Sequence, residues 1–221
     1  QPANANVIFV GDYGPWGYDT PIMIFRGDGS NTGAYWQMTS PNFPTNENRG
    51  YVTYCWVRKR SANTANGFYF GTTTTAGHIE TLASVACTNP YFFQSIGTPA
   101  SIVVGKWYLG VGVIHPTEVA TTTDTGIAGV YDPENGKVVI AGTEFKHAAG
   151  ATDQYIRYLF NSTSYNYDAD DGFDIAGPCV YEMDGTEPTI SEMLGRGTSG
   201  GPQGNTVAVH ANGTVVLSNA N

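Results

Sequence analysis

Apolar and polar side chains alternate with a period of two along much of the chain, and the pattern is clearest in residues 101–115. This stretch carries one charge, Lys106, and its odd-numbered positions from Trp107 to Val113 are all large and apolar. A period of two predicts a β-strand. The opposite face includes Gly110 and Gly112, and glycine within a strand marks a bulge or a close approach of another segment. We expect 101–115 to be a central strand covered on both faces, with Trp107 enclosed by two apolar layers.

Further stretches with this alternation recur between turn signals such as Asp132-Pro-Glu-Asn-Gly136. Thr189–Leu194 is the single helix that we expect. Many short strands separated by turns are typical of an antiparallel β-sandwich, so the predicted class is all-β, with a jelly-roll sandwich as its architecture. The other predicted strands span residues 7–10, 22–25, 51–60, 68–71, 78–85, 91–96, 126–131, 137–145, 154–160 and 173–183.

The composition changes after Leu194. Residues 1–195 are predicted to form the β-sandwich domain, 196–206 a glycine-rich connector and 207–221 a C-terminal β-hairpin. An isolated hairpin is marginally stable in water. We therefore expect it to dock on the sandwich, to pair with another chain in a homo-oligomer or larger assembly, or to begin a further module.

The charge balance excludes some classes of partner. Charged residues make up 13% of the chain, against about 25% in typical soluble domains, and glycine and tyrosine are abundant. The net charge of −9 argues against binding to nucleic acid, which needs clustered Lys and Arg. No apolar stretch approaches the ~20 residues that span a bilayer, so we expect no membrane insertion. This composition favours an extracellular protein or one on a virion surface. The three widely spaced cysteines indicate free thiols rather than a disulfide framework.

Aromatic residues are concentrated in segments rich in glycine, proline and asparagine, which predicts that loops display them. Exposed aromatic rings are suited to sugars, because the apolar face of a pyranose packs on a ring while its hydroxyls bond nearby polar groups. The alternative is that each ring packs in the core or against its own loop. The candidate ligand-binding residues are Trp16, Tyr18, Tyr35, Trp36, Tyr165 and Tyr167.

An acidic run is the candidate metal site. It contains Asp168, Asp170, Asp171 and Asp174. Calcium accepts six to eight oxygen ligands in flexible geometry, so clustered carboxylates of this kind can bind it. The alternative is a solvated acidic loop. No other cofactor is indicated.

Three blocks occur in a set order: Val52–Lys59 with Gly67–Gly71, then Lys106–Val113, then Phe173–Glu192. In this order they resemble laminin-G-like and concanavalin A-like jelly-roll domains. The segment Trp107–Leu194 as a whole resembles adhesive or receptor-binding modules of phage tail fibres and bacterial surface proteins. The resemblance implies a sandwich fold on which calcium sites are common.

Glu182, Asp184 and Glu187 fit the E-x-D-x-x-E pattern, and so resemble the catalytic carboxylates of laminarinase- and carrageenase-like hydrolases of this fold. In a retaining mechanism two such carboxylates stand about 5 Å apart across the sugar. The residues between them also have the composition of a turn leaving a strand, which is the alternative. His115, at the end of the central strand beside Pro116, is expected to be a hydrogen-bonded residue at the rim of the sandwich.

These observations favour a carbohydrate- or surface-receptor-binding adhesion module, lectin-like in character, over an enzyme. Its partner would be a glycan or a cell-surface receptor. Two alternatives remain open. One is a structural protein of a virion or surface assembly that makes only protein contacts, and the other is a polysaccharide endo-hydrolase that uses the three carboxylates.

Overall fold

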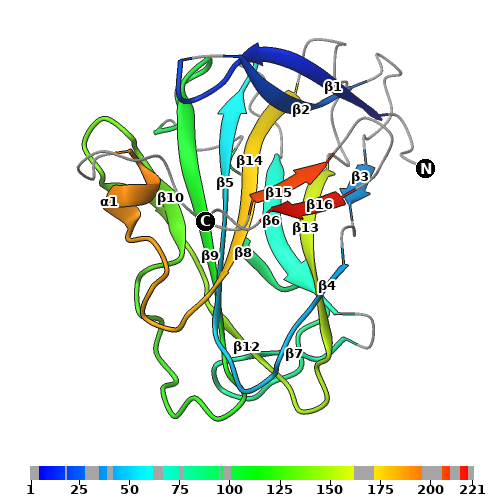
Figure 1. The fold of residues 1–221 in the computed structure, drawn as a ribbon, viewed down its shortest axis with the longest axis vertical. Helices are drawn as coiled ribbons and strands as arrows, with labels where there is room; N and C mark the ends of the chain where they lie inside the picture. The colour runs from blue at the N-terminus through cyan, green and yellow to red at the C-terminus, as the bar shows by residue number, and fades with distance from the viewer. Residues whose placement is uncertain are drawn as a thin grey trace.

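Strands make up nearly all of the regular structure, which confirms the predicted all-β class (Figure 1). The computed structural model describes residues 5–17, 19–27, 35–38, 42–61, 67–74, 77–94, 96, 101–161, 172–195, 206–209 and 215–218. Two sheets pack as a sandwich. The single helix in the described part of the chain is α1 (Ile190–Met193), which begins with a capping box between Thr189 and Glu192.

The larger sheet contains the predicted central strand. Its antiparallel path runs in the order β1 (Ala5–Tyr13), β2 (Asp19–Gly27), β14 (Gly172–Glu182), β5 (Tyr51–Lys59), β9 (Trp107–His115), β10 (Gly129–Tyr131) and β11 (Val138–Ala141). Beside this path, β12 (Phe145–His147) pairs with β9 in parallel and with β7 (Ile79–Thr81) in antiparallel orientation. The hairpin of β15 (Thr206–Val209) and β16 (Val215–Ser218) pairs with β14.

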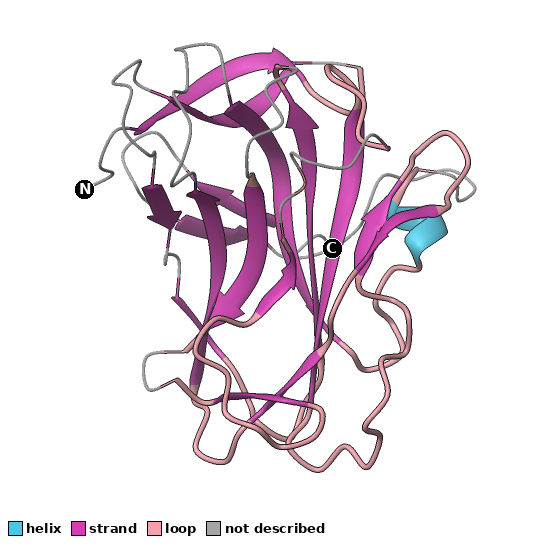
Figure 2. Cartoon of the chain, turned by 180° about the vertical axis from the view of Figure 1, so that it is seen from behind, coloured by secondary structure: helices cyan, strands magenta, loops and turns pink. Residues whose placement is uncertain are grey.

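The smaller sheet covers one face of the larger one, as the view from behind shows (Figure 2). Its order is β3 (Tyr35–Met38), β13 (Asp153–Asn161), β6 (Phe68–Thr73) and β8 (Tyr91–Phe93), and β4 (Asn42–Pro44) also pairs with β13.

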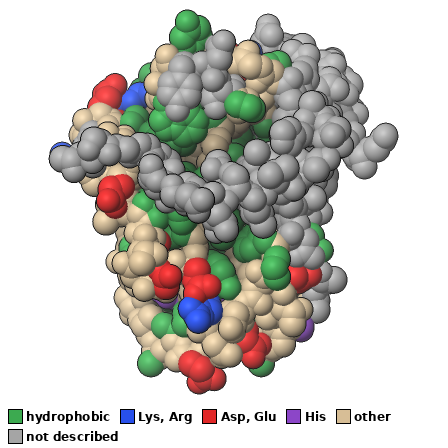
Figure 3. Space-filling model, viewed as in Figure 1, with side chains coloured by type: hydrophobic (Ala, Val, Ile, Leu, Met, Phe, Trp, Pro, Cys, Tyr) green, Lys and Arg blue, Asp and Glu red, His purple; other side chains and the backbone are tan. Residues whose placement is uncertain are grey.

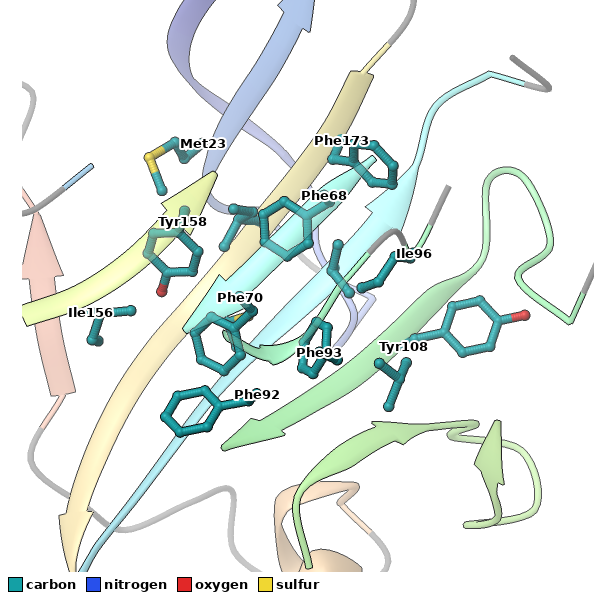
Figure 4. Packing of buried hydrophobic residues seen from close by; sticks show 14 of the residues in the cluster. Met23, Phe68, Phe70, Phe92, Phe93, Ile96, Tyr108, Ile156, Tyr158 and Phe173 are labelled. Carbon is teal, nitrogen blue, oxygen red and sulfur yellow. The ribbon is translucent and has the colours of Figure 1, made fainter. Parts of the chain in front are cut away.

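Aromatic side chains dominate the core between the sheets (Figure 4). Phe92 and Phe93 of β8 lie against the two glycines of β9. A Cβ atom at Gly112 would stand 2.1 Å from the Phe92 ring, and one at Gly110 would stand 2.6 Å from Phe93. The glycines therefore permit the close approach that the sequence indicates, and their face of β9 is the one turned toward the smaller sheet.

The expectation that two apolar layers enclose Trp107 is wrong. The strand begins at Trp107, because residues 101–106 form turns held by the Tyr108 hydroxyl, which accepts from the Val103 N–H and donates to the Ser101 carbonyl. Tyr108 occupies the core, at 1% exposure, whereas Trp107 is partly exposed on the opposite face. Alternation identifies two faces of a strand but does not say which one meets the second sheet.

Other strand boundaries also differ. The strands β3 and β4 lie in the segment for which we predicted loops. The stretch 137–145 is divided between β11 and β12, because the chain turns at Gly142, where a Cβ atom would stand 2.6 Å from the Ala128 backbone. The strands predicted at 78–85, 91–96 and 126–131 are shorter in the structure.

The face of the larger sheet turned away from the smaller one, here called the outer face, carries a second apolar cluster. Its members come from the sheet, from the segment at Ala128 and from Met193 of α1. A bulge interrupts β14 on this face, where the pairing with β5 shifts register between Ala176 and Cys179.

The cysteines Cys55, Cys87 and Cys179 are free, as predicted. Within the described residues no helix is long and apolar enough to cross a membrane.

Candidate functional site

Trp16 lies in the turn between β1 and β2 and packs on the outer face. Its ring centroid is 6.2 Å from that of Trp56, in an edge-to-face arrangement with an interplanar angle of 72°. A Cβ atom at Gly177 would stand 2.5 Å from the Trp16 ring, and Gly177 has a φ of +52°. Glycine in the β14 bulge therefore makes room for the indole, which remains partly exposed.

Trp107 lies on the same face and carries a cation over its ring. The guanidinium carbon of Arg58 is 4.6 Å from the Trp107 ring centroid. The register of the sheet places Arg58 opposite Trp107 on one side and opposite Asp174 on the other. Indole, guanidinium and carboxylate therefore stand side by side on three neighbouring strands.

Arg58 bridges two carboxylates of different character. It contacts Asp174 at 2.6 Å and Asp12 of β1 at 3.1 Å. Asp174 is completely buried and also accepts from Arg60 at 2.8 Å, whereas the side chain of Asp12 is 44% exposed. The Tyr13 backbone N–H and the Arg58 guanidinium lower the pKa of Asp12, so this surface carboxylate is ionised at neutral pH.

Two tyrosines extend the aromatic surface along β5 and β14. Tyr54 and Tyr181 stack with ring centroids 5.8 Å apart, and their hydroxyl oxygens are 3.4 Å apart. Tyr54 is buried, and burial is the main reason why its pKa is raised. Tyr181 is partly exposed.

We call Trp16, Trp107, Arg58 and Asp12 the indole site. Its two indoles are partly exposed, and Tyr13 beside it is 66% exposed. Rings of this kind provide an apolar platform, and the Asp12 carboxylate and Arg58 guanidinium provide hydrogen-bonding groups close to it. This combination suits a sugar ring. Figure 3 shows hydrophobic side chains at the surface in the upper half and the centre of the molecule, with acidic ones around them.

The structure describes only part of the predicted ligand-binding set. Trp16 lies on the outer face as described above. The backbones of Tyr35 and Trp36 lie in β3, but their side chains are outside the described part of the structure. Tyr18, Tyr165 and Tyr167 lie outside the described residues. A binding role for these five stays a prediction.

The predicted metal ligands are divided in the same way. Asp174 is occupied by two guanidinium groups, and Asp168, Asp170 and Asp171 lie outside the described residues. Within the part of the chain that the structure describes, no group of three or more His, Cys, Asp or Glu side chains could hold a metal ion. Calcium binding stays a prediction for the acidic run.

The three carboxylates of the E-x-D-x-x-E pattern form a hydrogen-bonded turn. Glu182 pairs with Arg49. Asp184 accepts from the N–H and hydroxyl of Thr186, at 2.9 and 2.6 Å, and these bonds lower its pKa. Glu187 accepts from the Gly185 N–H at 2.7 Å. Asp184 and Glu187 thus bond within the turn that the sequence left as the alternative, and a catalytic role for the three carboxylates stays a prediction.

Glu144 holds the segment that follows β9. Its buried carboxylate accepts from a ring nitrogen of His115 at 2.7 Å, from the Thr125 hydroxyl, and from the backbone N–H groups of Thr125, Ile127 and Ala128. These bonds outweigh burial and lower its pKa to about 2. His115 is thus the hydrogen-bonded rim residue that the sequence predicts.

Sequence reasoning placed Trp16 among the binding candidates but missed Trp107, Arg58 and Asp12. The sequence predicts Trp107 in the core and places Arg58 near the end of the predicted strand 51–60, without a binding role. A partial signal is present, because Trp56 and Arg58 are two residues apart in a predicted strand and therefore lie on the same face.

No family model and no curated protein matches the sequence. Among solved structures, the chain is similar to an exo-beta-agarase with a TM-score of 0.50 and 12% sequence identity. The similarity covers 88% of this chain but only 24% of the agarase chain. It concerns the fold alone, which it relates to a carbohydrate-active protein.

Proposed function

We propose that the chain is a carbohydrate- or surface-receptor-binding module of an extracellular or virion-surface protein. The observation that carries this proposal is the indole site, where the partly exposed Trp16 and Trp107 share one face with the ion-paired Arg58 and Asp12. A sugar would stack on an indole and exchange hydrogen bonds with the carboxylate and the guanidinium. The likeness to the fold of an exo-beta-agarase is compatible with such a role.

Replacing Trp107 with alanine will weaken glycan binding by about 30-fold or more. Aromatic side chains at the centre of a binding surface typically contribute 2 kcal/mol or more, and each 1.4 kcal/mol is a factor of ten. The measurement is a glycan array that includes agarose oligosaccharides, followed by titration of the best ligand with intrinsic tryptophan fluorescence.

Two variants control this experiment. Trp107→Tyr keeps an aromatic platform beside Arg58 and should retain part of the affinity. Tyr155→Ala removes a partly exposed ring from the opposite sheet and should leave binding unchanged. Equal affinity of Trp107→Ala and the wild type would contradict the assignment of the site. Stable symmetric association without binding to any glycan would favour the alternative of a structural assembly protein.

A further inference from the structure

Several polar groups are buried at one end of the sandwich interior. His147 and Gln154 are both 0% exposed and Thr53 is 1% exposed. Within the described part of the structure, no normal hydrogen bond reaches either ring nitrogen of His147, either amide atom of Gln154, or the buried hydroxyls of Thr45 and Thr53. We call these four residues the buried polar cluster.

The strands bring His147 and Gln154 to the same place. His147 is on the face of β12 that also carries the core residue Phe145, and its ring lies 5.7 Å from that of Tyr51. Phe43 is paired with Gln154 across β4 and β13, and its ring lies 6.4 Å from that of Tyr51. Tyr51 is therefore adjacent to both.

The two threonines flank this position. Thr53 follows Tyr51 by two residues on β5, so it points to the same face. Thr45 follows Phe43 by two residues, and its backbone N–H donates to the Thr152 carbonyl at 3.1 Å, beside Gln154. Thr53 therefore shares the inner face of β5 with Tyr51, and Thr45 lies just after β4, next to the strand that carries Gln154.

Such a group is costly if it stays dry. Each buried donor or acceptor without a partner typically destabilises the folded state by about 1–3 kcal/mol, and natural proteins satisfy such groups with internal water. Burial lowers the pKa of His147, while the Gln154 side chain, which approaches the ring without normal hydrogen-bond geometry, and the charge of Glu47 act to raise it. The neutral ring offers one donor and one acceptor. Neutral groups that donate and accept hydrogen bonds are suited to water, because a water molecule also donates and accepts hydrogen bonds.

We propose that the buried polar cluster is an internal hydration site, in which ordered water bridges the His147 ring to the Gln154 amide and reaches the hydroxyls of Thr45 and Thr53. A metal ion is not the occupant that these residues fit, because the described residues bring together no group of three ligands. The site lies between the sheets and does not depend on the proposed function at the outer face.

A crystal structure of the whole chain at high resolution tests the occupant directly. We expect a water oxygen at about 2.7–3.2 Å from both a His147 ring nitrogen and a Gln154 amide atom. A direct hydrogen bond between His147 and Gln154 with no water beside it would overturn the proposal. Density for a larger ligand in the same place would overturn it too.

Thermal unfolding of two matched variants gives an independent test. Thr72→Val removes a buried hydroxyl that has a protein partner, the Tyr155 carbonyl at 3.0 Å, and should lower the unfolding temperature by about 2–4 °C. If Thr53 is bonded to water, Thr53→Val will lower it by a similar amount. An unchanged or higher unfolding temperature for Thr53→Val would mean that its hydroxyl is dry, and would contradict the hydration site.

Discussion

Glu144→Ala is expected to lower the free energy of unfolding by about 3–5 kcal/mol. The Glu144 carboxylate is buried and accepts hydrogen bonds from His115 and from three residues of the 125–128 segment, namely Thr125, Ile127 and Ala128. Alanine would leave these donors without an acceptor in the interior. Urea unfolding followed by tryptophan fluorescence measures the loss.

Glu118→Ala is the matched control for Glu144→Ala, because Glu118 is exposed. A surface substitution of this kind should change stability by less than about 0.5 kcal/mol. If the two variants lose the same stability, Glu144 does not hold the 125–128 segment.

The pH dependence of stability gives a second readout of Glu144. Its pKa is lowered from 4.5 to about 2 in the folded state. The unfolded state therefore takes up the proton first as the pH falls. The contribution of the ionised carboxylate, about 3 kcal/mol, is fully present above about pH 4.5 and is lost as the pH falls toward 2. Glu144→Gln should lack this part of the acid destabilisation, so profiles of equal slope for the variant and the wild type would contradict the assignment.

Asp174→Ala is expected to have an effect of similar size, a loss of about 3–5 kcal/mol. Its side chain is completely buried between Arg58 and Arg60, at 2.6 and 2.8 Å. Removing the carboxylate takes this ion pair from Arg60 and leaves Arg58 paired with Asp12 alone, so the positive charge at this position is no longer balanced. The measurement is again urea unfolding.

Asp12→Ala is the control that distinguishes the loss of a buried carboxylate from the loss of an exposed ion pair with the same arginine. Asp12 also contacts Arg58, but its side chain is 44% exposed, and exposed ion pairs contribute at most about 1 kcal/mol. If Asp174→Ala lowers the free energy of unfolding by no more than Asp12→Ala does, then the buried Asp174 carboxylate does not hold Arg58 and Arg60 in place.

Local patterns predicted the elements of the fold well where the period was clear. The alternation of residues 51–59 gives β5, the turn at Asp132–Gly136 separates β10 from β11, and the pattern at Thr189 gives the capped helix. The short strands β3 and β4 were missed because their segment is rich in turn-forming residues. Sheet pairing then stabilises strands that local propensity does not favour.

The candidate site was less predictable, because it depends on the register between distant strands. Arg58 meets Trp107 and Asp174 only after β5 has paired with β9 and β14 in one particular register. Asp12 reaches the same guanidinium across 46 positions of sequence. No local period encodes these neighbours. The sequence could therefore suggest aromatic binding residues such as Trp16, but not their charged partners.

The bulge in β14 also sets which side chains the second half of this strand presents. Before it, the even-numbered Ala176 lies on the outer face, and after it the odd-numbered Cys179 and Tyr181 lie there. The two halves of the strand are thus out of phase by one residue. Deleting a single residue between Ala176 and Cys179 would leave one residue opposite Cys55 and give one uninterrupted alternation, in which Ala176, Cys179 and Tyr181 still share the outer face.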